Sequence, residues 1–401
     1  MNNVQDDAYN NLVHQLYLAY FDARKNKRNT HNQLAFEVNF ESNLIQLADK
    51  IHSRAYTPKP SIAFIVNKPV KREIFAAHFS DRVVHHLIYR AINPQVDRHF
   101  IHDAYSCRKN KGNLYGIQRA KHFIRSATQN HQQQAFVLKL DIQGYFMHIE
   151  HEIIYQKTLD LLDKNALYNT LSFELIDYLL QRTIFNDVAQ DCHIKGSGTE
   201  WRGLPKDKSL FHTKKGVGLP IGNLTSQLFG NIYLNSFDHY VKKTLKIKHY
   251  GRYVNDMLFV HQDKERLKSV VAHVNHEVGK IGLQLHPKKI YLQSCDHGVL
   301  FLGQYIKPYR SYISNRVKHY FYQTLHKVNC LLVETEAIEW QVMKQIQSSL
   351  NAYLGILKHA NTYNLIKKAC GVLITRIQIR SASLLKLLGQ LCVRPLNHLA
   401  F

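Results

Sequence analysis

The spacing of hydrophobic positions predicts a helical start to the chain. Apolar side chains recur at the spacing of one helix face in two stretches: Leu12, Leu16 and Tyr20, then Leu44, Leu47 and Ile51. The polar stretch 24–33 between them is expected to be a loop. Residues 61–66 and 68–75 then have the pattern of a strand pair around a turn, and helical spacing resumes over 81–92.

The middle of the chain has the shorter rhythm of strands. The apolar run 135–141 ends in Asp141, as expected of a central strand, and 250–260 is a second apolar stretch with polar residues at its tip. These tip residues are Asn255 and Asp256, and the pattern predicts a hairpin that presents both side chains at its turn.

Glycines and long apolar periodicities organise the rest of the chain. A glycine-bearing turn at 215–222 leads into a helix that is expected over 225–243. After Gly303 the composition favours long helices, which are expected at 315–333, 336–354 and 361–388. This tail is therefore predicted to form a separate helical subdomain.

Length and composition place the chain among ordinary globular proteins. Its 401 residues are 45% hydrophobic and 21% charged, which argues against disorder. No apolar run approaches the roughly 18 residues of a membrane span, and the polar, acidic stretch 1–10 does not resemble a signal peptide. We therefore expect a cytoplasmic protein with no membrane partner. The six cysteines are scattered without a C-x-x-C pair, so neither a zinc ribbon nor a disulfide framework is expected.

The charge balance changes this picture. Lys and Arg total 53 against 30 Asp and Glu, a formal net charge of +23, with 25 His in addition. Such an excess is self-repelling unless a polyanion shares the surface, so it favours a nucleic-acid partner. A basic soluble protein without such a partner is the alternative.

Asp141 and Asp256 are candidate ligands for divalent metal ions. Nucleotidyl transfer uses two metals about 4 Å apart, and Mg²⁺ prefers carboxylate oxygens on a rigid backbone. An aspartate that ends one strand, next to an acidic hairpin, could supply that arrangement. Alone, however, two aspartates so far apart in sequence are a weak signal, because most such residues occupy turns or helix caps.

The sequence around these positions resembles bacterial reverse transcriptases over nearly the whole chain. Residues 218–235, GLPIGNLTSQLFGNIYLN, closely resemble the loop and helix that hold the template base and the incoming nucleotide in that family. Residues 138–146, LKLDIQGYF, resemble its first catalytic strand. The resemblance implies an α+β right-hand polymerase with an antiparallel palm sheet. Its parts would be a helical N-terminal extension at 1–60, fingers and palm at 61–310, and a helical thumb at 311–401.

The resemblance also implies roles for residues around the metals. Asp141 would hold both ions, with the Ile142 carbonyl as a further ligand. Phe146 would exclude ribonucleotides by a clash at the sugar 2′ position, which predicts a DNA product; the alternative is a buried core phenylalanine. Gly222 would let the backbone approach the nucleotide, and the side chains of Asn223 and Gln227 could hydrogen-bond bases or sugars.

Basic residues would contact the triphosphate and the primer. By resemblance, Arg72 and Arg108 would clasp the triphosphate, for which the planar guanidinium is suited. Lys288 or Lys289 would serve as general acid toward the leaving pyrophosphate, and the sequence does not choose between them. The segment 299–303 resembles the primer-grip hairpin, which includes Phe301, Leu302 and Gly303.

One position departs from the family pattern. The metal-binding hairpin of the family reads Tyr-x-Asp-Asp, whereas residues 253–256 here read Tyr-Val-Asn-Asp. Asn255 offers a neutral oxygen, and losing a charge from such a site typically costs several kcal/mol of metal affinity or transition-state stabilisation. Three interpretations follow. The enzyme still works with Asp141 and Asp256 carrying the metals and Asn255 as a weak ligand; it is a degenerate subunit that supports another polymerase; or the asparagine is an engineered knock-out.

These features together predict an RNA-directed DNA polymerase. It would use deoxynucleoside triphosphates, an RNA template and two Mg²⁺ ions, with Mn²⁺ as an alternative, and release a DNA product. Family analogy alone suggests a role in bacterial antiphage defence, with a dedicated non-coding RNA, a protein partner or a homo-oligomer. The alternatives are a catalytically impaired nucleic-acid-binding subunit of a larger complex and an RNA-templated RNA polymerase.

Overall fold

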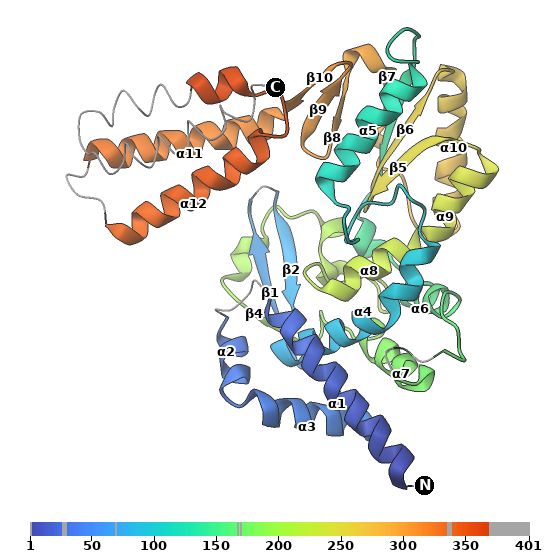
Figure 1. Ribbon diagram of the computed structural model, residues 1–401, viewed down its shortest axis with the longest axis vertical. Coiled ribbons are helices and arrows are strands. Elements are labelled where there is room, and N and C mark those ends of the chain that lie inside the picture. The colour runs from blue at the N-terminus through green and yellow to red at the C-terminus, as the bar shows by residue number, and fades with distance from the viewer. Residues whose placement is uncertain are drawn as a thin grey trace. The chain divides into compact units, whose positions relative to one another are not determined.

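Three helices begin the chain in the computed structural model, which describes residues 2–25, 30–68, 70–166, 168, 171–334 and 339–368. They are α1 (Asn2–Arg24), α2 (His31–Val38) and α3 (Phe40–His52), and α1 lies along both α3 and α4 (Phe79–His99) (Figure 1). The prediction of a loop reaching Gln33 was wrong, because α2 begins at His31. Phe36 explains the difference: its ring packs 5.2 Å from that of Phe79 in α4, a tertiary contact that helical periodicity alone does not show.

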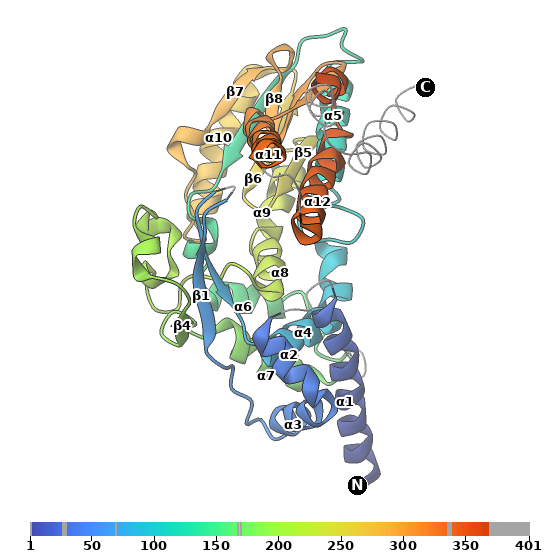
Figure 2. The same ribbon diagram turned by 90° about the vertical axis from the view of Figure 1, so that its left-hand side faces the viewer.

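The predicted strand pair is confirmed as a two-stranded ribbon that a third strand extends (Figure 2). Strand β1 (Ser61–Val66) pairs antiparallel with β2 (Arg72–Ala76), with Val66 opposite Arg72. On its other side β1 pairs in parallel with β4 (Cys192–Ile194). Arg72 is therefore the first residue of its strand.

A buried carboxylate joins this ribbon to the segment that follows β4. Glu73 is 1% exposed and accepts three hydrogen bonds from that segment. The donors are Nε1 of Trp201 (2.6 Å), Oγ of Ser209 (2.7 Å) and the backbone N–H of Leu210 (2.6 Å). Because side chains alternate along a strand, Glu73 points inward while its neighbour Arg72 is exposed.

Five further helices within the described residues belong to this part of the chain. They are α6 (His151–Leu159), α7 (Phe173–Ile184), α8 (Leu224–Tyr233), α9 (Asn235–His239) and α10 (Lys264–Gly279). Helix α8 contacts α4 and α6 and is buried along most of its length. The helix expected over 225–243 is interrupted at Leu234, after which α9 and a π-helical turn at Tyr240–Thr244 continue the path. Short 3-10 helices lie at Tyr145–His148, Gly198–Trp201, Lys206–Lys208, Leu210–His212, Pro287–Lys289 and Cys295–His297.

A four-stranded sheet carries the candidate carboxylates. Its order is β5 (His249–Tyr253), β6 (Asp256–His261), β3 (Phe136–Asp141) and β7 (Tyr291–Ser294). The two middle strands, β6 and β3, are mostly buried, which confirms the predicted central strand. The predicted hairpin is also confirmed, with Val254 and Asn255 forming the turn between β5 and β6.

The chain folds into two compact units. The first contains residues 1–112, 138–259 and 265–291, and the second contains 113–137, 260–264 and 292 onward. The second unit comprises α5 (Asn113–Ala127), β8 (Val299–Phe301), β9 (Gln304–Lys307), β10 (Arg310–Ile313), α11 (Asn315–Glu334) and α12 (Trp340–Leu357). Its three strands form one sheet in the order β10-β9-β8.

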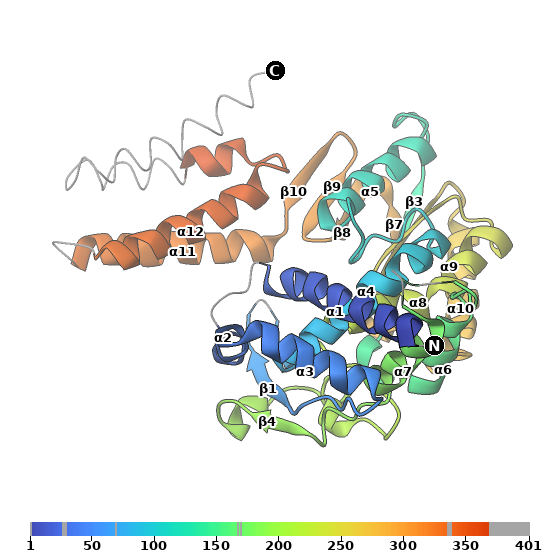
Figure 3. The same ribbon diagram turned by 60° about the horizontal axis from the view of Figure 1, so that its bottom comes forward.

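Helices α11 and α12 pack side by side within this second unit (Figure 3). They correspond to the first two helices predicted for the tail, and they bury Phe321, Leu325, Val328, Leu350 and Leu357 in a common apolar core. The third predicted helix, 361–388, lies outside the described residues beyond position 368. None of the helices in the described part of the chain has both the length and the apolar character that a bilayer span requires.

Candidate active site

The end of β3 and the β5–β6 turn meet through a reciprocal pair of hydrogen bonds. The backbone N–H of Ile142 donates to the backbone carbonyl of Asn255 (3.3 Å). In return, the side-chain amide Nδ2 of Asn255 donates to the carbonyl of Ile142 (3.2 Å). These two bonds hold the turn against the end of β3, and the two carboxylates, Asp141 and Asp256, flank them in sequence.

Each of these carboxylates has a lysine as its counter-ion. Nζ of Lys289 lies 3.0 Å from Oδ1 of Asp141, and Nζ of Lys139 lies 3.2 Å from Oδ1 of Asp256. Burial raises the pKa of Asp141 and the nearby charge of Asp256 adds to the effect, whereas Lys289 opposes it. Lys139 was not among the residues nominated from sequence, although its place two residues before Asp141 puts both side chains on one face of β3.

The structure distinguishes between the two candidate lysines. The N–H of Gln143 donates to the carbonyl of Gln284 (2.9 Å) and the N–H of His286 donates to the carbonyl of Asp141 (2.8 Å). The segment that precedes the lysines thus runs along the end of β3. It brings Lys289 to Asp141, while the side chain of Lys288 is exposed.

The donor set fits a hard divalent cation in part. Two carboxylates, the Ile142 carbonyl and the Asn255 side-chain oxygen are all oxygen ligands of the kind that Mg²⁺ binds. The amide of Asn255, however, turns its nitrogen toward Ile142, so the carbonyl of Ile142 already has a donor. Within the described residues, no group of three or more His, Cys, Asp or Glu gathers around a single point. Asp141 and Asp256 are therefore the two carboxylates at the end of β3 and the adjoining turn that could bind a cation.

The two arginines nominated for the triphosphate lie in different environments. All five N–H donors of Arg108 are used internally: Nε and Nη2 donate to the carboxylate of Asp97 (2.6 and 3.1 Å), Nη2 also to its carbonyl (3.2 Å), and Nη1 to the carbonyls of Ile101 (2.7 Å) and Ala104 (3.1 Å). Arg108 therefore braces its own segment. Arg72 is exposed.

Arg72 also lies close enough to the hairpin to affect a tyrosine there. Burial raises the pKa of Tyr253, and the positive charge of Arg72 opposes that rise. Tyr253 directly precedes the turn that carries Asn255. Of the two arginines, Arg72 is thus the exposed one, and its charge reaches Tyr253.

The glycine-bearing loop runs into α8 beside the ribbon. Gly222 has φ of +124°, and a Cβ there would lie 3.0 Å from Cγ2 of Ile74 and 3.3 Å from the carbonyl of Phe75. A side chain at this position would therefore be strained and crowded. Gln227, one turn into α8, is exposed, and its Oε1 accepts a hydrogen bond from Sγ of Cys107 (2.8 Å).

Phe146 combines packing with partial exposure. It is half-buried, and a Cβ on Gly230 of α8 would lie 3.2 Å from its Cε1. One side of the ring packs against a cluster formed by Ala63, Phe75, Met147, Val188 and Leu210. The two roles considered from the sequence, core residue and sugar-facing ring, are therefore compatible in one side chain.

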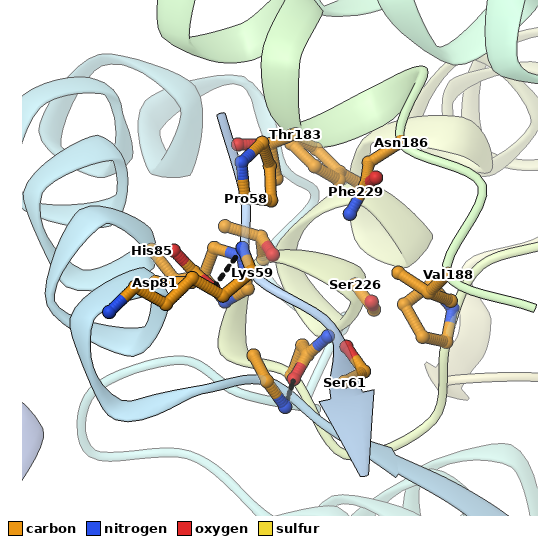
Figure 4. Close-up of a pocket in the computed structure, with 14 residues that line it drawn as sticks. Pro58, Lys59, Ser61, Asp81, His85, Thr183, Asn186, Val188, Ser226 and Phe229 are labelled. Carbon is orange, nitrogen blue, oxygen red and sulfur yellow. Dashed lines mark hydrogen bonds between the residues drawn. The ribbon is translucent and has the colours of Figure 1, made fainter. Parts of the chain in front are cut away.

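Asn223 lines a small cavity, and Figure 4 labels Asp81 and His85 among the other residues that line it. It is 5% exposed, and its Oδ1 accepts a hydrogen bond from the N–H of Ala77 (3.4 Å). The cavity has a volume of about 20 Å³, which is room for a single water molecule. Asn223 thus has an internal partner that the sequence did not indicate.

Asp81 and His85 line this cavity together with Asn223. Asp81 accepts hydrogen bonds from the hydroxyl of Tyr56 and the N–H of Lys59, each at 2.9 Å, and burial raises its pKa to about 6. Burial also lowers the pKa of His85 to about 3. Nδ1 of His85 has no hydrogen-bond partner among the described residues.

The predicted primer-grip segment forms a tight hairpin in the second unit. Phe301 ends β8 and is fully buried, and Gln304 begins β9. Leu302 and Gly303 form the turn between these strands, with φ of +47° and +86°. Two positive φ values in a two-residue turn match the right-handed twist of the flanking strands. The Phe301 side chain is thus buried, while Leu302 and Gly303 in the turn are partly exposed.

A match to a protein family agrees with this geometry. Residues 66–306 match the family described as "Reverse transcriptase (RNA-dependent DNA polymerase)". Because this match covers more than half of the chain, the chain belongs to the reverse transcriptase family. The α+β right-hand polymerase class expected from the sequence is confirmed. No curated protein matches the chain.

Solved telomerase structures are similar to parts of the chain. Apo telomerase from Candida tropicalis, truncated from its C-terminal domain, has 14% identity and a TM-score of 0.46, and the match covers 68% of this chain and 60% of that one. Telomerase from Candida albicans, in complex with the TWJ fragment of telomeric RNA, has 13% identity and a TM-score of 0.41, with coverages of 86% and 64%. The matches thus span about six tenths of those telomerase chains.

Proposed function

We propose that this protein is an RNA-directed DNA polymerase that joins deoxynucleoside triphosphates by two-metal nucleotidyl transfer. The observation that carries the proposal is the meeting of Asp141 with Asp256 at one end of a buried sheet, within a segment that matches the family. Lys289 lies at the same point, 3.0 Å from Asp141. The reaction requires carboxylates that bind divalent metal ions and a group that can donate a proton to the leaving pyrophosphate. Asp141 and Asp256 are suited to the first task and Lys289 to the second.

Each residue at the site then has a chemical task. Asp141 and Asp256 would hold the divalent ions, which would lower the pKa of the primer 3′-hydroxyl and neutralise the charge of the triphosphate. The ammonium of Lys289 transfers from Asp141 to the leaving pyrophosphate and donates a proton to it. Arg72 binds the outer phosphates with its exposed guanidinium. Phe146 fills the space beside the sugar 2′ carbon and disfavours ribonucleotides.

Asn255 limits turnover in this proposal without affecting the fold. Its amide donates to Ile142, so the hairpin keeps its place on the end of β3 although the side chain carries no charge. The missing charge weakens the binding of the second ion and the stabilisation of the transition state. The enzyme then depends on Asp141 and Asp256 alone.

Primer extension on an RNA template tests this function directly. The native chain and Asn255→Asp would be compared in Mg²⁺ and in Mn²⁺, with Asp141→Asn in each background as the inactive control. We expect Asn255→Asp to raise the extension rate about 10²-fold, the usual effect of one charged group at such a site. We expect Asn255→Ala, which also loses the bond to Ile142, to be slower than the native chain.

A catalytically impaired nucleic-acid-binding subunit is the second candidate, and one observation favours it. Both carboxylates are neutralised by lysines, and the Ile142 carbonyl is capped by Asn255. If Asn255→Asp extends no primer while the chain still binds nucleic acid in a salt-dependent manner, the polymerase proposal is wrong and this one stands. Preferential use of ribonucleotides would instead indicate an RNA polymerase and contradict the role of Phe146.

The biological setting is proposed on family analogy alone. We place the protein in bacterial antiphage defence, working with a non-coding RNA template or a protein partner, and assign 61–310 to fingers and palm and 311–401 to the thumb. The net charge of +23 supports a nucleic-acid partner. Sequencing the nucleic acid that co-purifies with the protein from cells would identify template and product together. Recovery of unrelated cellular RNA alone would count against a dedicated template.

A further inference from the structure

The turn that carries Asn255 and Asp256 has an unusual backbone conformation. Val254, its first residue, has φ of +55°. This is the left-handed region, which a β-branched side chain rarely adopts because its Cβ substituents crowd the backbone. Something in the surroundings must therefore stabilise the turn in this form. The carbonyl of Val254 accepts a hydrogen bond from Nη1 of Arg252 at 2.8 Å.

Arg252 is a buried cation with a fixed orientation. Its side chain and that of Asp238 are both 0% exposed. Nε donates to both oxygens of Asp238 (2.8 and 3.1 Å), and Nη2 donates to Oδ2 (2.6 Å). The hydroxyl of Tyr250 donates to the same carboxylate at 2.6 Å. Burial alone would lower the pKa of Arg252, but the Asp238 carboxylate raises it, so the charge persists.

The backbone of Arg252 is fastened as firmly as its side chain. Its N–H donates to the carbonyl of Asp103 (2.8 Å), and its carbonyl accepts from the N–H of Tyr105 (2.9 Å). A Cβ on the preceding Gly251 would collide with the hydroxyl of Tyr105, so the two segments can approach this closely because residue 251 is a glycine. The guanidinium therefore extends from a rigid base toward the turn.

We propose that Arg252 is a positioning residue that holds Val254 in the left-handed conformation and thereby directs Asn255 and Asp256 toward Asp141. Asp238 keeps the guanidinium aligned so that Nη1 faces the turn. The inference rests on the proposed function only in that this turn is taken as the catalytic one. It assigns Arg252 no contact with substrate or metal.

The competing explanation is that Arg252 and Asp238 only stabilise the interior. Under that explanation any loss at residue 252 would act on the whole unit, and the conformation demanded of residue 254 would be irrelevant. If Arg252 acts through the turn, relieving the strain at residue 254 should make Arg252 less necessary. Glycine adopts φ near +55° without crowding, so Val254→Gly separates the two explanations.

Hydrogen exchange read by mass spectrometry would measure the effect. Arg252→Lys keeps a cation for Asp238, but a single ammonium cannot also hold the Val254 carbonyl. We expect peptides within 249–261 to exchange about tenfold faster, as for the loss of one charged hydrogen bond, with peptides of α4 unchanged. Arg82→Lys is the matched control, since Nη2 of Arg82 donates to the carbonyl of Ala23 (3.0 Å) elsewhere in the same unit.

The double variant Arg252→Lys with Val254→Gly decides the matter. The proposal is supported if peptides within 249–261 exchange in the double variant about as slowly as they do in Val254→Gly alone. Equal acceleration in both backgrounds, or acceleration that reaches α4 equally, would overturn it. Primer extension of the same variants in the Asn255→Asp background is the second readout, where kcat should fall and recover in parallel. If the Asn255→Asp chain itself extends no primer, the proposed function is wrong. The hydrogen-exchange data would still test the role of Arg252.

Discussion

Ion pairs at the tip of the sheet differ from those that support it. At the tip, Lys289 contacts one oxygen of Asp141 and Lys139 contacts one oxygen of Asp256. The side chain of Lys289 is 44% exposed and that of Lys139 is 19% exposed. Beneath the tip, Arg252 meets both oxygens of Asp238 in complete burial. A lysine is a point charge on a flexible stem, whereas an arginine is a rigid fork. The tip pairs can be exchanged for other cations, and the buried pair cannot.

A similar contrast separates the two arginines, Arg72 and Arg108, that were predicted to bind the triphosphate. Arg108 uses all five N–H donors within its own segment, and Arg252 donates from each of its three nitrogens to Asp238 or Val254. Arg72 is exposed. The proposal that Arg72 and not Arg108 binds the triphosphate therefore rests on which side chain already has its donors occupied, because the residue type is the same.

The largest expected effect is on the buried pair. Asp238→Asn leaves the charge of Arg252 without its counter-ion in a site with no access to water. Removing one partner of such a pair typically costs about 3–5 kcal/mol. Urea unfolding followed by circular dichroism would measure the loss. Lys139→Met, which breaks a tip pair, should cost less than about 1 kcal/mol. Equal losses in the two variants would contradict the contrast.

The next largest expected effect is the pH dependence of stability that comes from Asp81, a buried carboxylate that accepts no hydrogen bond from an arginine among the described residues. The hydrogen-bond donors to Asp81 are uncharged, namely Tyr56 and Ser80 hydroxyls and the Lys59 N–H. Its pKa rises from 3.8 to about 6 on folding, so between these values the folded state binds the proton more tightly. The contribution of Asp81 to stability is thus present below about pH 4 and is lost as the pH rises through 6.

Asp81→Asn removes that pH dependence. We expect the free energy of unfolding of the native chain, relative to the variant, to fall by about 1–3 kcal/mol between pH 4 and pH 7. Urea titrations at several pH values would show it. A constant difference across the range would mean that Asp81 is not raised in pKa. His85, in the same cavity, is neutral over this range because burial lowers its pKa to about 3.

The smallest expected effect concerns metal binding at the tip. Lys139→Met removes a positive charge that competes with a divalent ion for Asp256, so Mn²⁺ should bind about tenfold more tightly, a change close to the roughly 1 kcal/mol by which two unit charges 4 Å apart interact in bulk water. Electron paramagnetic resonance of free Mn²⁺ would measure this. Lys280→Met is the matched control, because Lys280 pairs with Glu277 on α10. Unchanged affinity in Lys139→Met would show that the lysine does not compete.

The elements of the fold were largely predictable from sequence because periodicity and motif carry them. The strand that ends in Asp141 and the hairpin of Asn255 and Asp256 were predicted as they occur. The start of α2 was missed because Phe36 is fixed by a tertiary contact with Phe79.

The site was only partly predictable, because its counter-ions come from contacts that no motif records. Lys139 was detectable in principle from its two-residue offset to Asp141. The pairing of Arg252 with Asp238 was not, because it depends on the interruption of the helix at Leu234, which turns α9 toward β5. Nor could the sequence show that Arg108 forms an ion pair with Asp97, because that pair depends on how the chain folds back after α4.

The burial of Glu73 limits how far the segment between β4 and α8 can be shortened. Its carboxylate is satisfied by Trp201, Ser209 and Leu210, all from a segment that looks dispensable between β4 and α8. Trimming that segment would leave a buried carboxylate without its hydrogen-bond donors, directly beside Arg72 near the turn of the β1–β2 ribbon. A smaller version of the protein would therefore need Glu73→Gln or an apolar residue there as part of the same design.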